Sequence, residues 1–313
     1  MRRALAVTLT AVLLGGTACT DTPVSGPRQP VETTGVATPS TDPTTEEAAA
    51  PRRFEADRAM ATVRDLAGGI GPRPATSPAF RTAAAYVADA FAAQGYAVRR
   101  EPFRVPGGDS WGVPVGPGRS LNVVAEPPHL DRGAPYVLVG AHLDTVAVAP
   151  GAEDNASGVA VLLEIARVLA AEEPVVLVAF GGEEPVGDGH LHHFGSKHQV
   201  AGLSAADRRN LRAMVSLDRV GVGSRVPIGF HPGTSPRVAE DLAAAARRVG
   251  IDAVVGTSTT SDHESFAVEG LPAARIGGTD YDAYHSTADR PAGVDPAQLS
   301  RVGRLLIAWL RGS

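Results

Sequence analysis

Short apolar runs alternate with segments of helical spacing in the second half of the chain, and this alternation is what most constrains the fold. Tyr136–Gly140, Val175–Phe180 and Ala213–Leu217 are such runs. Runs of this length and composition predict strands that are buried on both faces of a parallel sheet. Helices between them supply the crossover connections. We therefore expect an α/β fold: one three-layer domain with a mainly parallel central sheet, antiparallel edge strands and helices on both faces.

The other elements follow from the same patterns. Apolar residues at helical spacing predict helices over Phe54–Leu66, Ser77–Gln94, Ser157–Ala171, Ser235–Val249, Asp262–Val268 and Pro296–Leu310. Alternating or short apolar runs predict further strands at Ala97–Val105, Ser120–Glu126, Val226–Phe230, Ala253–Val255 and Ala273–Ile276. The first two of these are expected to be exposed edge strands.

The N-terminus has the pattern of an export signal. Arg2 and Arg3 precede an apolar run at 4–14, and small residues then lead to Cys19. The run is much shorter than the roughly 20 residues that span a bilayer, so we expect a signal peptide instead of a membrane helix. Cys19 resembles a bacterial lipoprotein cleavage site, although Gly16 stands where Leu is usual. The alternative is a plain signal peptide with an incidental cysteine.

We expect three regions. Residues 1–19 form a lipoprotein-type signal peptide, residues 20–52 a disordered tether rich in Thr and Pro, and residues 53–313 the folded domain. The domain would then lie on the outer face of the cell membrane, anchored through lipidated Cys19, or be secreted. The net charge of -5 argues against a nucleic-acid partner. With one cysteine in the chain, any metal must be held by His, Asp and Glu.

Polar residues with metal-binding chemistry follow several of the predicted strands. They are His142 and Asp144, Asp154 before a helix, Glu183 and Glu184 after two glycines, Asp218, and Tyr284 with His285 in a late loop. Open α/β sheets place ligands beyond the carboxyl ends of their strands. Each residue also has an ordinary structural interpretation, such as a helix cap at Asp154 or a solvated turn at Glu183. Together they predict a two-metal hydrolase site with a spare Glu facing a water.

In order, the motifs resemble those of the M28 zinc peptidases, which include secreted bacterial aminopeptidases of the Streptomyces and Aeromonas type. The resemblance extends from about Phe54 to the C-terminus. It rests on Ile70-Gly71-Pro72-Arg73-Pro74, Gly140-Ala141-His142-Leu143-Asp144-Thr145, Glu153-Asp154-Asn155-Ala156-Ser157-Gly158, Gly182-Glu183-Glu184, Ser216-Leu217-Asp218, Ser261-Asp262-His263 and Tyr284-His285-Ser286.

The resemblance implies a role for each site residue. His142 and Asp218 would bind one Zn²⁺, Glu184 and His285 a second, and Asp154 would bridge the two ions and precede a cis peptide bond. Glu183 would be the general base, Asp144 the partner that orients His142, and Tyr284 a donor to the oxyanion. The implied substrates are peptides with a free N-terminus, which makes the expected activity that of an aminopeptidase.

Other interpretations stay open. The same scaffold also suits a dipeptidase, a carboxypeptidase, a single-zinc glutaminyl cyclase or a non-catalytic binding lipoprotein. His190, His192 and His193 belong either to a surface loop or to a rim that alters the substrate pocket or binds extra metal. Asp262 and His263 are expected to support a loop by hydrogen bonds. Arg219, which follows Asp218, is either a residue that faces the substrate or an ordinary structural residue. Thr260 replaces an Arg that binds substrate in the Streptomyces-type enzymes.

Overall fold

The computed structural model describes Gly26, residues 52–188 and residues 190–312. The expected signal peptide, the lipid anchor at Cys19 and nearly all of the tether lie outside these residues and stay predictions. Within the described residues, no helix combines the length and the apolar character needed to cross a bilayer.

Ten strands and eight α-helices make up the described part of the domain. The strands are β1 (Ala97–Val105), β2 (Gly108–Ser110), β3 (Val113–Val115), β4 (Gly118–Glu126), β5 (Tyr136–His142), β6 (Val175–Phe180), β7 (Leu211–Asp218), β8 (Val226–Phe230), β9 (Ala253–Thr257) and β10 (Ala273–Gly277). The helices are α1 (Ala56–Val63), α2 (Pro78–Ala92), α3 (Ser157–Leu169), α4 (Phe194–Ala201), α5 (Ala205–Asn210), α6 (Arg237–Arg248), α7 (His263–Ala267) and α8 (Pro296–Leu310), with short turns η1 (Arg64–Ile70), η2 (Ala152–Ala156) and η3 (Pro291–Gly293).

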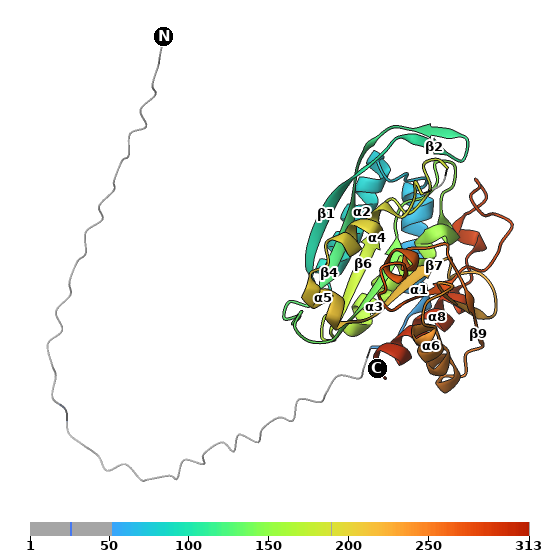
Figure 1. The fold of residues 1–313 in the computed structure, drawn as a ribbon. Coiled ribbons are helices and arrows are strands. Elements are labelled where there is room, and N and C mark those ends of the chain that lie inside the picture. Colours follow the sequence, from blue (N-terminus) through green and yellow to red (C-terminus); the bar gives the residue numbers. More distant parts are fainter. Residues whose placement is uncertain (1–25, 27–51, 189, 313) are drawn as a thin grey trace. The chain divides into compact units, whose positions relative to one another are not determined.

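The central sheet has the order β1-β4-β6-β5-β7-β10-β8-β9 (Figure 1). Its middle strands β6, β5, β7 and β10 are parallel to one another. On one side β4 is antiparallel to both β1 and β6, and on the other side β8 is antiparallel to β10. The expected mainly parallel sheet with antiparallel flanks is therefore confirmed. The expected strands and helices all have counterparts in the structure, with shifts of a few residues at their ends.

Both faces of the sheet are covered. Val139 and Leu177 belong to a core shared with α1, α2, α3, α6 and α8, while Leu138 and Val176 face a second core shared with α4 and α7. Successive residues of a strand point to opposite faces, so a strand that is apolar at every position is buried between two helical layers. This explains why the continuous apolar runs were reliable signals.

The helix starts are also set by local sequence. Ser77 accepts a hydrogen bond from the N–H of Phe80, and Pro78 occupies the first turn of α2. Asp295 accepts from the N–H of Ala297 in the same way at the start of α8. These are standard N-terminal caps, and they fix the direction in which each helix leaves its loop.

One strand differs from its expected position. We expected β4 to be an exposed edge strand, but it lies between β1 and β6, and Val123 and Val124 are fully buried. The polar residue that suggests solvent exposure, Asn122, is buried as well. Its side chain donates to the carbonyl of Gly195 and accepts from the N–H of Gly181, so its polar atoms are satisfied inside the protein.

Candidate metal centre

The carboxyl ends of the parallel strands bring the expected ligands to one edge of the sheet. His142 ends β5 and Asp218 ends β7, and these two strands are adjacent and parallel. Glu184 follows β6, which pairs with β5 on its other side. Asp154 comes from η2 and His285 from the loop before α8. None of the five residues is more than 7% exposed, so bulk water does not solvate their charges.

The five residues form two triplets that share Asp154. In the first, His142 Nε2 lies 3.0 Å from Asp154 Oδ1 and 3.6 Å from Asp218 Oδ1. In the second, His285 Nε2 lies 3.2 Å from Asp154 Oδ2 and 3.2 Å from Glu184 Oε2. Asp154 therefore presents one carboxylate oxygen to each triplet, which is the arrangement required of a bridging ligand.

These distances fit metal ions. Zinc binds His nitrogen and carboxylate oxygen at about 2.0–2.2 Å, so two ligand atoms at a tetrahedral angle are roughly 3.3–3.6 Å apart. The buried atoms His285 Nε2 and Glu184 Oε1 make no hydrogen bond within the described residues. Buried polar atoms of a native protein rarely lack partners. Imidazole and carboxylate groups that converge in this way have the chemistry of a zinc site.

The electrostatics also call for added positive charge. Burial alone would lower the pKa of His142, but the surrounding carboxylates of Glu183, Asp154 and Asp218 raise it well above its ordinary value. Burial and the charge of Asp154 raise the pKa of Glu184 to about 8. Without cations, the pocket can lower its excess negative charge only by holding protons on these groups.

Glu183 lies beside the two triplets. Its Oε2 is 3.9 Å from His142 Nε2, and its Oε1 is 3.0 Å from His193 Nε2. Burial would raise the pKa of Glu183, but the positive charges of His142 and His193 outweigh that effect and lower it. Gly182 makes the preceding turn with a φ of 66°, in the left-handed region that glycine adopts without a steric penalty.

Asp144 positions the two glutamates. Its Oδ1 and Oδ2 accept hydrogen bonds of 3.1 Å from the backbone N–H groups of Glu183 and Glu184. We expected its carboxylate to orient the ring of His142, but His142 Nδ1 lies 4.0 Å from Oδ1 of Asp144 and 3.2 Å from its backbone carbonyl. The carbonyl is thus the group within hydrogen-bonding distance of the ring, because the carboxylate is already held by the Glu-Glu turn.

Two residues outside the expected set hold the loop that carries Asp154. Asp289 accepts hydrogen bonds from the backbone N–H groups of Glu153 and Asp154, at 2.8 and 3.1 Å. Arg73 is fully buried and donates to the carbonyls of Leu143, Pro150 and Gly151, among others. The expected cis peptide bond after Asp154 is present.

Arg275 is a third supporting residue that sequence reasoning did not identify. Its Nη2 lies 3.1 Å from Asp218 Oδ2, on the side of the carboxylate away from His142. Its Nη1 donates to both the carbonyl and the hydroxyl of Thr260. Arg275 therefore ties the loop that carries Thr260 to the carboxylate of Asp218.

Tyr284 and Trp111 flank His285 at the mouth of the site. The Tyr284 ring stacks on His285 with centroids 3.7 Å apart. The guanidinium of Arg219 also lies over the Tyr284 ring, 4.7 Å from its centre. Trp111, from the turn between β2 and β3, meets His285 edge-on at 4.4 Å. Trp111 is 52% exposed, and the sequence patterns did not single it out as part of the site.

The histidine segment after the Glu-Glu pair is divided between surface and site. His190 is exposed, whereas His193 is buried against Glu183, so the surface-loop interpretation is wrong for His193. Asp262 is buried, and burial and the charge of Glu183 raise its pKa to about 7. His263 Nε2 lies 3.0 Å from the carbonyl of Ser258, which agrees with the expected support of that loop.

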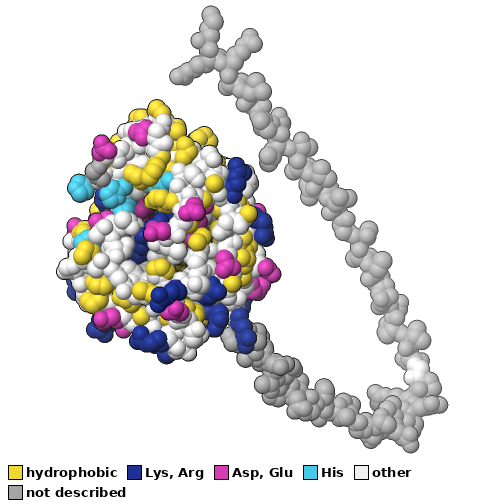
Figure 2. Space-filling view, turned by 90° about the vertical axis from the view of Figure 1, so that its right-hand side faces the viewer, with side chains coloured by type: hydrophobic (Ala, Val, Ile, Leu, Met, Phe, Trp, Pro, Cys, Tyr) yellow, Lys and Arg dark blue, Asp and Glu magenta, His cyan; other side chains and the backbone are white. Residues whose placement is uncertain are grey.

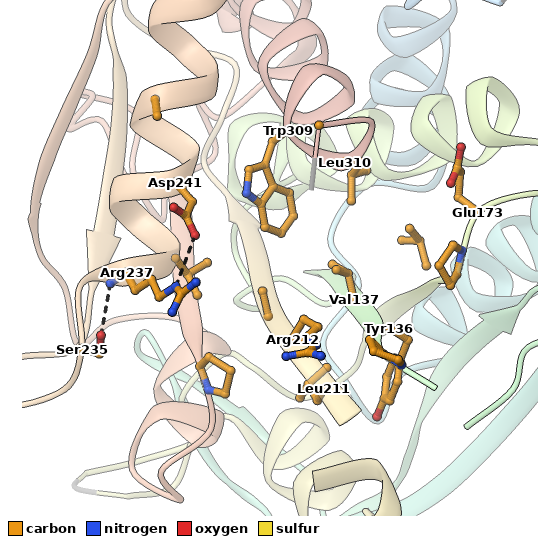
Figure 3. A pocket seen from close by; sticks show the side chains of 18 of the residues that line it. Tyr136, Val137, Glu173, Leu211, Arg212, Ser235, Arg237, Asp241, Trp309 and Leu310 are labelled. Atoms are coloured by element: carbon orange, nitrogen blue, oxygen red, sulfur yellow. Dashed lines mark hydrogen bonds and ion pairs between the residues drawn. The ribbon is translucent and has the colours of Figure 1, made fainter. Parts of the chain in front are cut away.

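A separate cavity of about 760 Å³ lies at the amino ends of β5 and β7, where Tyr136, Arg212 and Trp309 line it (Figure 3). It is at the opposite edge of the sheet from the carboxylate and histidine cluster. None of the expected site residues lines it.

Comparisons with known proteins agree with this geometry. The family model described as Peptidase family M28 matches residues 122–310. Aminopeptidase YwaD of Bacillus subtilis (strain 168) is 32% identical over 186 residues, which are 55% of this chain and 40% of that protein. Leupeptin-inactivating enzyme 1 of Streptomyces exfoliatus is 28% identical over 206 residues, 58% of this chain and 45% of that protein. The chain spans about half the length of the curated relatives it matches.

Solved structures show the same fold. A zinc aminopeptidase from Bacillus subtilis superposes with a TM-score of 0.73 at 21% identity, over 83% of this chain and 95% of that one. The glutaminyl cyclase of Porphyromonas gingivalis superposes with a TM-score of 0.70 at 25% identity, over 83% of this chain and 98% of that one. With the match of the family model over more than half of its length, the chain belongs to peptidase family M28.

Proposed function

We propose that this domain is a di-zinc exopeptidase, and specifically an aminopeptidase that releases residues from the free N-terminus of peptides. The observation that carries the proposal is the position of Asp154, whose two carboxylate oxygens face two different histidines at 3.0 and 3.2 Å. A carboxylate so placed is suited to bridging two ions. His142 and Asp218 would complete one ion's ligands, and Glu184 and His285 the other's.

Bound zinc would supply Lewis acidity and an acidic water at neutral pH. Glu183 is the residue placed to accept the proton of that water and to return it to the leaving amine. Its Oε2 faces His142 and its Oε1 is held by His193, so the carboxylate has one free oxygen directed toward the ligand cluster. The backbone of Glu183 is fixed in turn by Asp144.

Tyr284 is the proposed donor to the oxyanion. Its burial and the negative charge of Asp154 raise the pKa of the phenol, so that it keeps its proton over the working pH range. The ring is braced by His285 on one side and by Arg219. A protonated hydroxyl beside the ligand cluster is suited to donate a hydrogen bond to developing negative charge.

The preference for a free N-terminus is supported by the negative charge around the site and by the names of its relatives. Glu183 and Asp262 are close enough for their charges to interact, and carboxylates placed there would attract an ammonium group. The relatives include proteins named aminopeptidase. The membrane anchor is a separate proposal that rests on the export-signal pattern of residues 1–18 and on Cys19 after it. Mass spectrometry of the mature N-terminus tests it.

A single-zinc glutaminyl cyclase is the alternative, because two cyclases are among the similar structures. The first triplet argues against it, since His142, Asp154 and Asp218 converge as closely as the second triplet does. Zinc content per chain separates the two: a cyclase of this kind would hold one ion, and the proposed peptidase two.

The deciding experiment is hydrolysis of a peptide panel by the purified protein. The panel pairs aminoacyl peptides with the same peptides blocked at the N-terminus, and each is assayed as purified, after chelation, and after zinc is restored. We expect cleavage of the free peptides only, its loss on chelation and its recovery with zinc. Equal cleavage of blocked peptides would overturn the aminopeptidase assignment, and activity unaffected by chelation would overturn the metallopeptidase assignment.

A further inference from the structure

A second group of metal-binding side chains lies beside the proposed active site and takes no part in either triplet. His192 and His193 end the loop that precedes α4, and Glu264 lies in α7. One ligand atom from each residue lies within 4.8 Å of the other two. These three residues are called the rim site below. Histidine side chains gather on one part of the surface shown in Figure 2.

The backbone turns so that the two histidine rings meet. His193 has a φ of 56°, a left-handed conformation that is uncommon for a residue with a Cβ. Consecutive residues of an extended segment point their side chains in opposite directions. Here the rings of His192 and His193 contact each other with centroids 4.0 Å apart, at 82°. A strained conformation that brings two imidazoles together is typical of a functional position.

His193 has the two-sided arrangement of a metal-binding histidine. Its Nε2 lies 3.0 Å from Oε1 of Glu183, while its buried Nδ1 makes no hydrogen bond, although Oε2 of Glu264 is 3.3 Å away. Histidines that bind a metal through one nitrogen usually donate the other N–H to a carboxylate. The spacing of Nδ1 and Oε2 is again that of two ligands on one ion.

The surroundings allow a cation to enter. A cavity of about 500 Å³ borders His192 and Glu264, so the rim site is open to solvent on one side. The ammonium of Lys197 is held by the carbonyls of His190 and His192, at 3.1 and 2.8 Å. His231 approaches the second oxygen of Glu264 at 4.0 Å and is placed to act as a further ligand.

We propose that His192, His193 and Glu264 form a third metal site, separate from the two proposed catalytic ions and suited to zinc or a similar transition-metal ion. Two imidazoles and one carboxylate match the ligand preference of such ions. An ion on Nδ1 would keep the proton of His193 on Nε2, where it is donated to Glu183. This last consequence rests on the proposed function, because a metal ion in the rim site would then fix the hydrogen bond to Glu183, the proposed general base.

Zinc content of the purified protein tests the site without an activity assay. The protein is stripped with chelator, titrated with Zn²⁺ alone by calorimetry, and analysed for bound metal after removal of the excess. We expect three ions per chain in the parent protein and two in both His192→Ala and Glu264→Gln. His190→Ala is the matched control, since His190 lies in the same segment but outside the rim site, and should bind three.

The outcomes separate this proposal from the proposed function. Equal zinc content in the parent, His192→Ala and Glu264→Gln proteins overturns the rim site, whatever that number is. Asp154→Ala should keep the rim ion while losing at least one of the others. If the rim variants lose one ion from a parent that binds only two, the rim site stands and the di-zinc proposal fails. Co²⁺ in place of Zn²⁺ adds a spectroscopic check, because the rim variants should lose one set of absorption bands.

Discussion

Arg275 and Asp218 form a buried ion pair, with Nη2 of the arginine 3.1 Å from Oδ2 of the carboxylate. The other oxygen of Asp218 faces His142. Burial would raise the pKa of Asp218, but the charge of Arg275, followed by that of His142, lowers it to about 2. The arginine therefore keeps a buried carboxylate ionised and aimed at its proposed metal.

Removal of this arginine should weaken metal binding. In Arg275→Met, Asp218 loses its partner, and its carboxylate becomes easier to protonate and free to turn. We expect zinc affinity to fall about 10- to 100-fold, the range seen when groups that orient a metal ligand are removed. Competition with a fluorescent chelator measures the change. Arg225→Met, which removes an exposed arginine paired with Asp252, is the control and should bind zinc normally.

Glu183→Gln should separate metal binding from turnover. The amide has the same shape but does not accept the proton, so we expect turnover to fall by about 10²- to 10⁴-fold while zinc content stays unchanged. The comparison variant is Glu172→Gln, at an exposed position in the loop before β6. Turnover within a factor of two of the parent protein would remove Glu183 from the role of general base.

Asp289 should act on the metal site from a distance. In Asp289→Ala, the N–H groups of Glu153 and Asp154 lose their acceptors, and the loop that positions the bridging carboxylate loosens. We expect weaker zinc binding, again by about 10- to 100-fold. Asp282→Ala changes an exposed residue in the loop that carries Asp289, and it should leave the zinc affinity unaltered. Equal affinities in the two variants would contradict this role.

Arg73 should matter for stability, independently of any metal. Arg73→Met would leave several buried carbonyls without their donor, including those of Leu143 and Pro150. An unsatisfied buried acceptor costs about 1–3 kcal/mol, so we expect the free energy of unfolding to drop by about 3 kcal/mol or more. Urea unfolding in the presence of chelator measures it. Arg64→Met, at an exposed position, should stay within about 0.5 kcal/mol of the parent protein.

His263 should make the protein sensitive to mild acid. Burial, aided by the charge of Arg275, lowers the pKa of His263 from 6.5 to about 4. As pH falls below 6.5, the unfolded chain takes up a proton at this residue and the folded protein does not, so stability is lost between pH 6.5 and 4. The loss should reach about 3 kcal/mol at the acid end.

The measurement is urea unfolding at several pH values, with chelator present so that metal release does not contribute. His263→Gln keeps a side-chain donor for the carbonyl of Ser258 but does not titrate. Its stability should therefore fall less than that of the parent protein between pH 7 and pH 5. Parallel stability curves for the two proteins would show that His263 is not the group responsible.

The sequence predicted the central sheet well because its strands carry their own signal. β5, β6 and β7 are buried on both faces, and a continuous apolar run needs no knowledge of partners. The short hairpin β2–β3 and helices α4 and α5 were missed. Each has few residues, and the helices are held by contacts with β1 and β4 or by the capping box of Ser204 and Asp207 instead of by strong apolar periodicity.

The proposed ligands were recognisable because each stands at the end of an expected strand or in a known motif. The residues that support them were not. Asp289 contacts a loop 135 positions earlier, and Arg275 meets Asp218 from another strand 57 positions away. His193 looked like one of three loop histidines until the fold placed it against Glu183. Such pairs depend on tertiary geometry, and no local pattern encodes them.

The stretch matched by the family model begins at Asn122, yet the site is completed by residues that come earlier in the chain. A fragment trimmed to residues 122–310 would keep every proposed ligand but lose Arg73, which clamps the loops carrying His142 and Asp154, and Trp111, which shields His285. It would also lose β1 and leave the remainder of β4 as a bare edge. The residues that support this site therefore extend beyond its family signature.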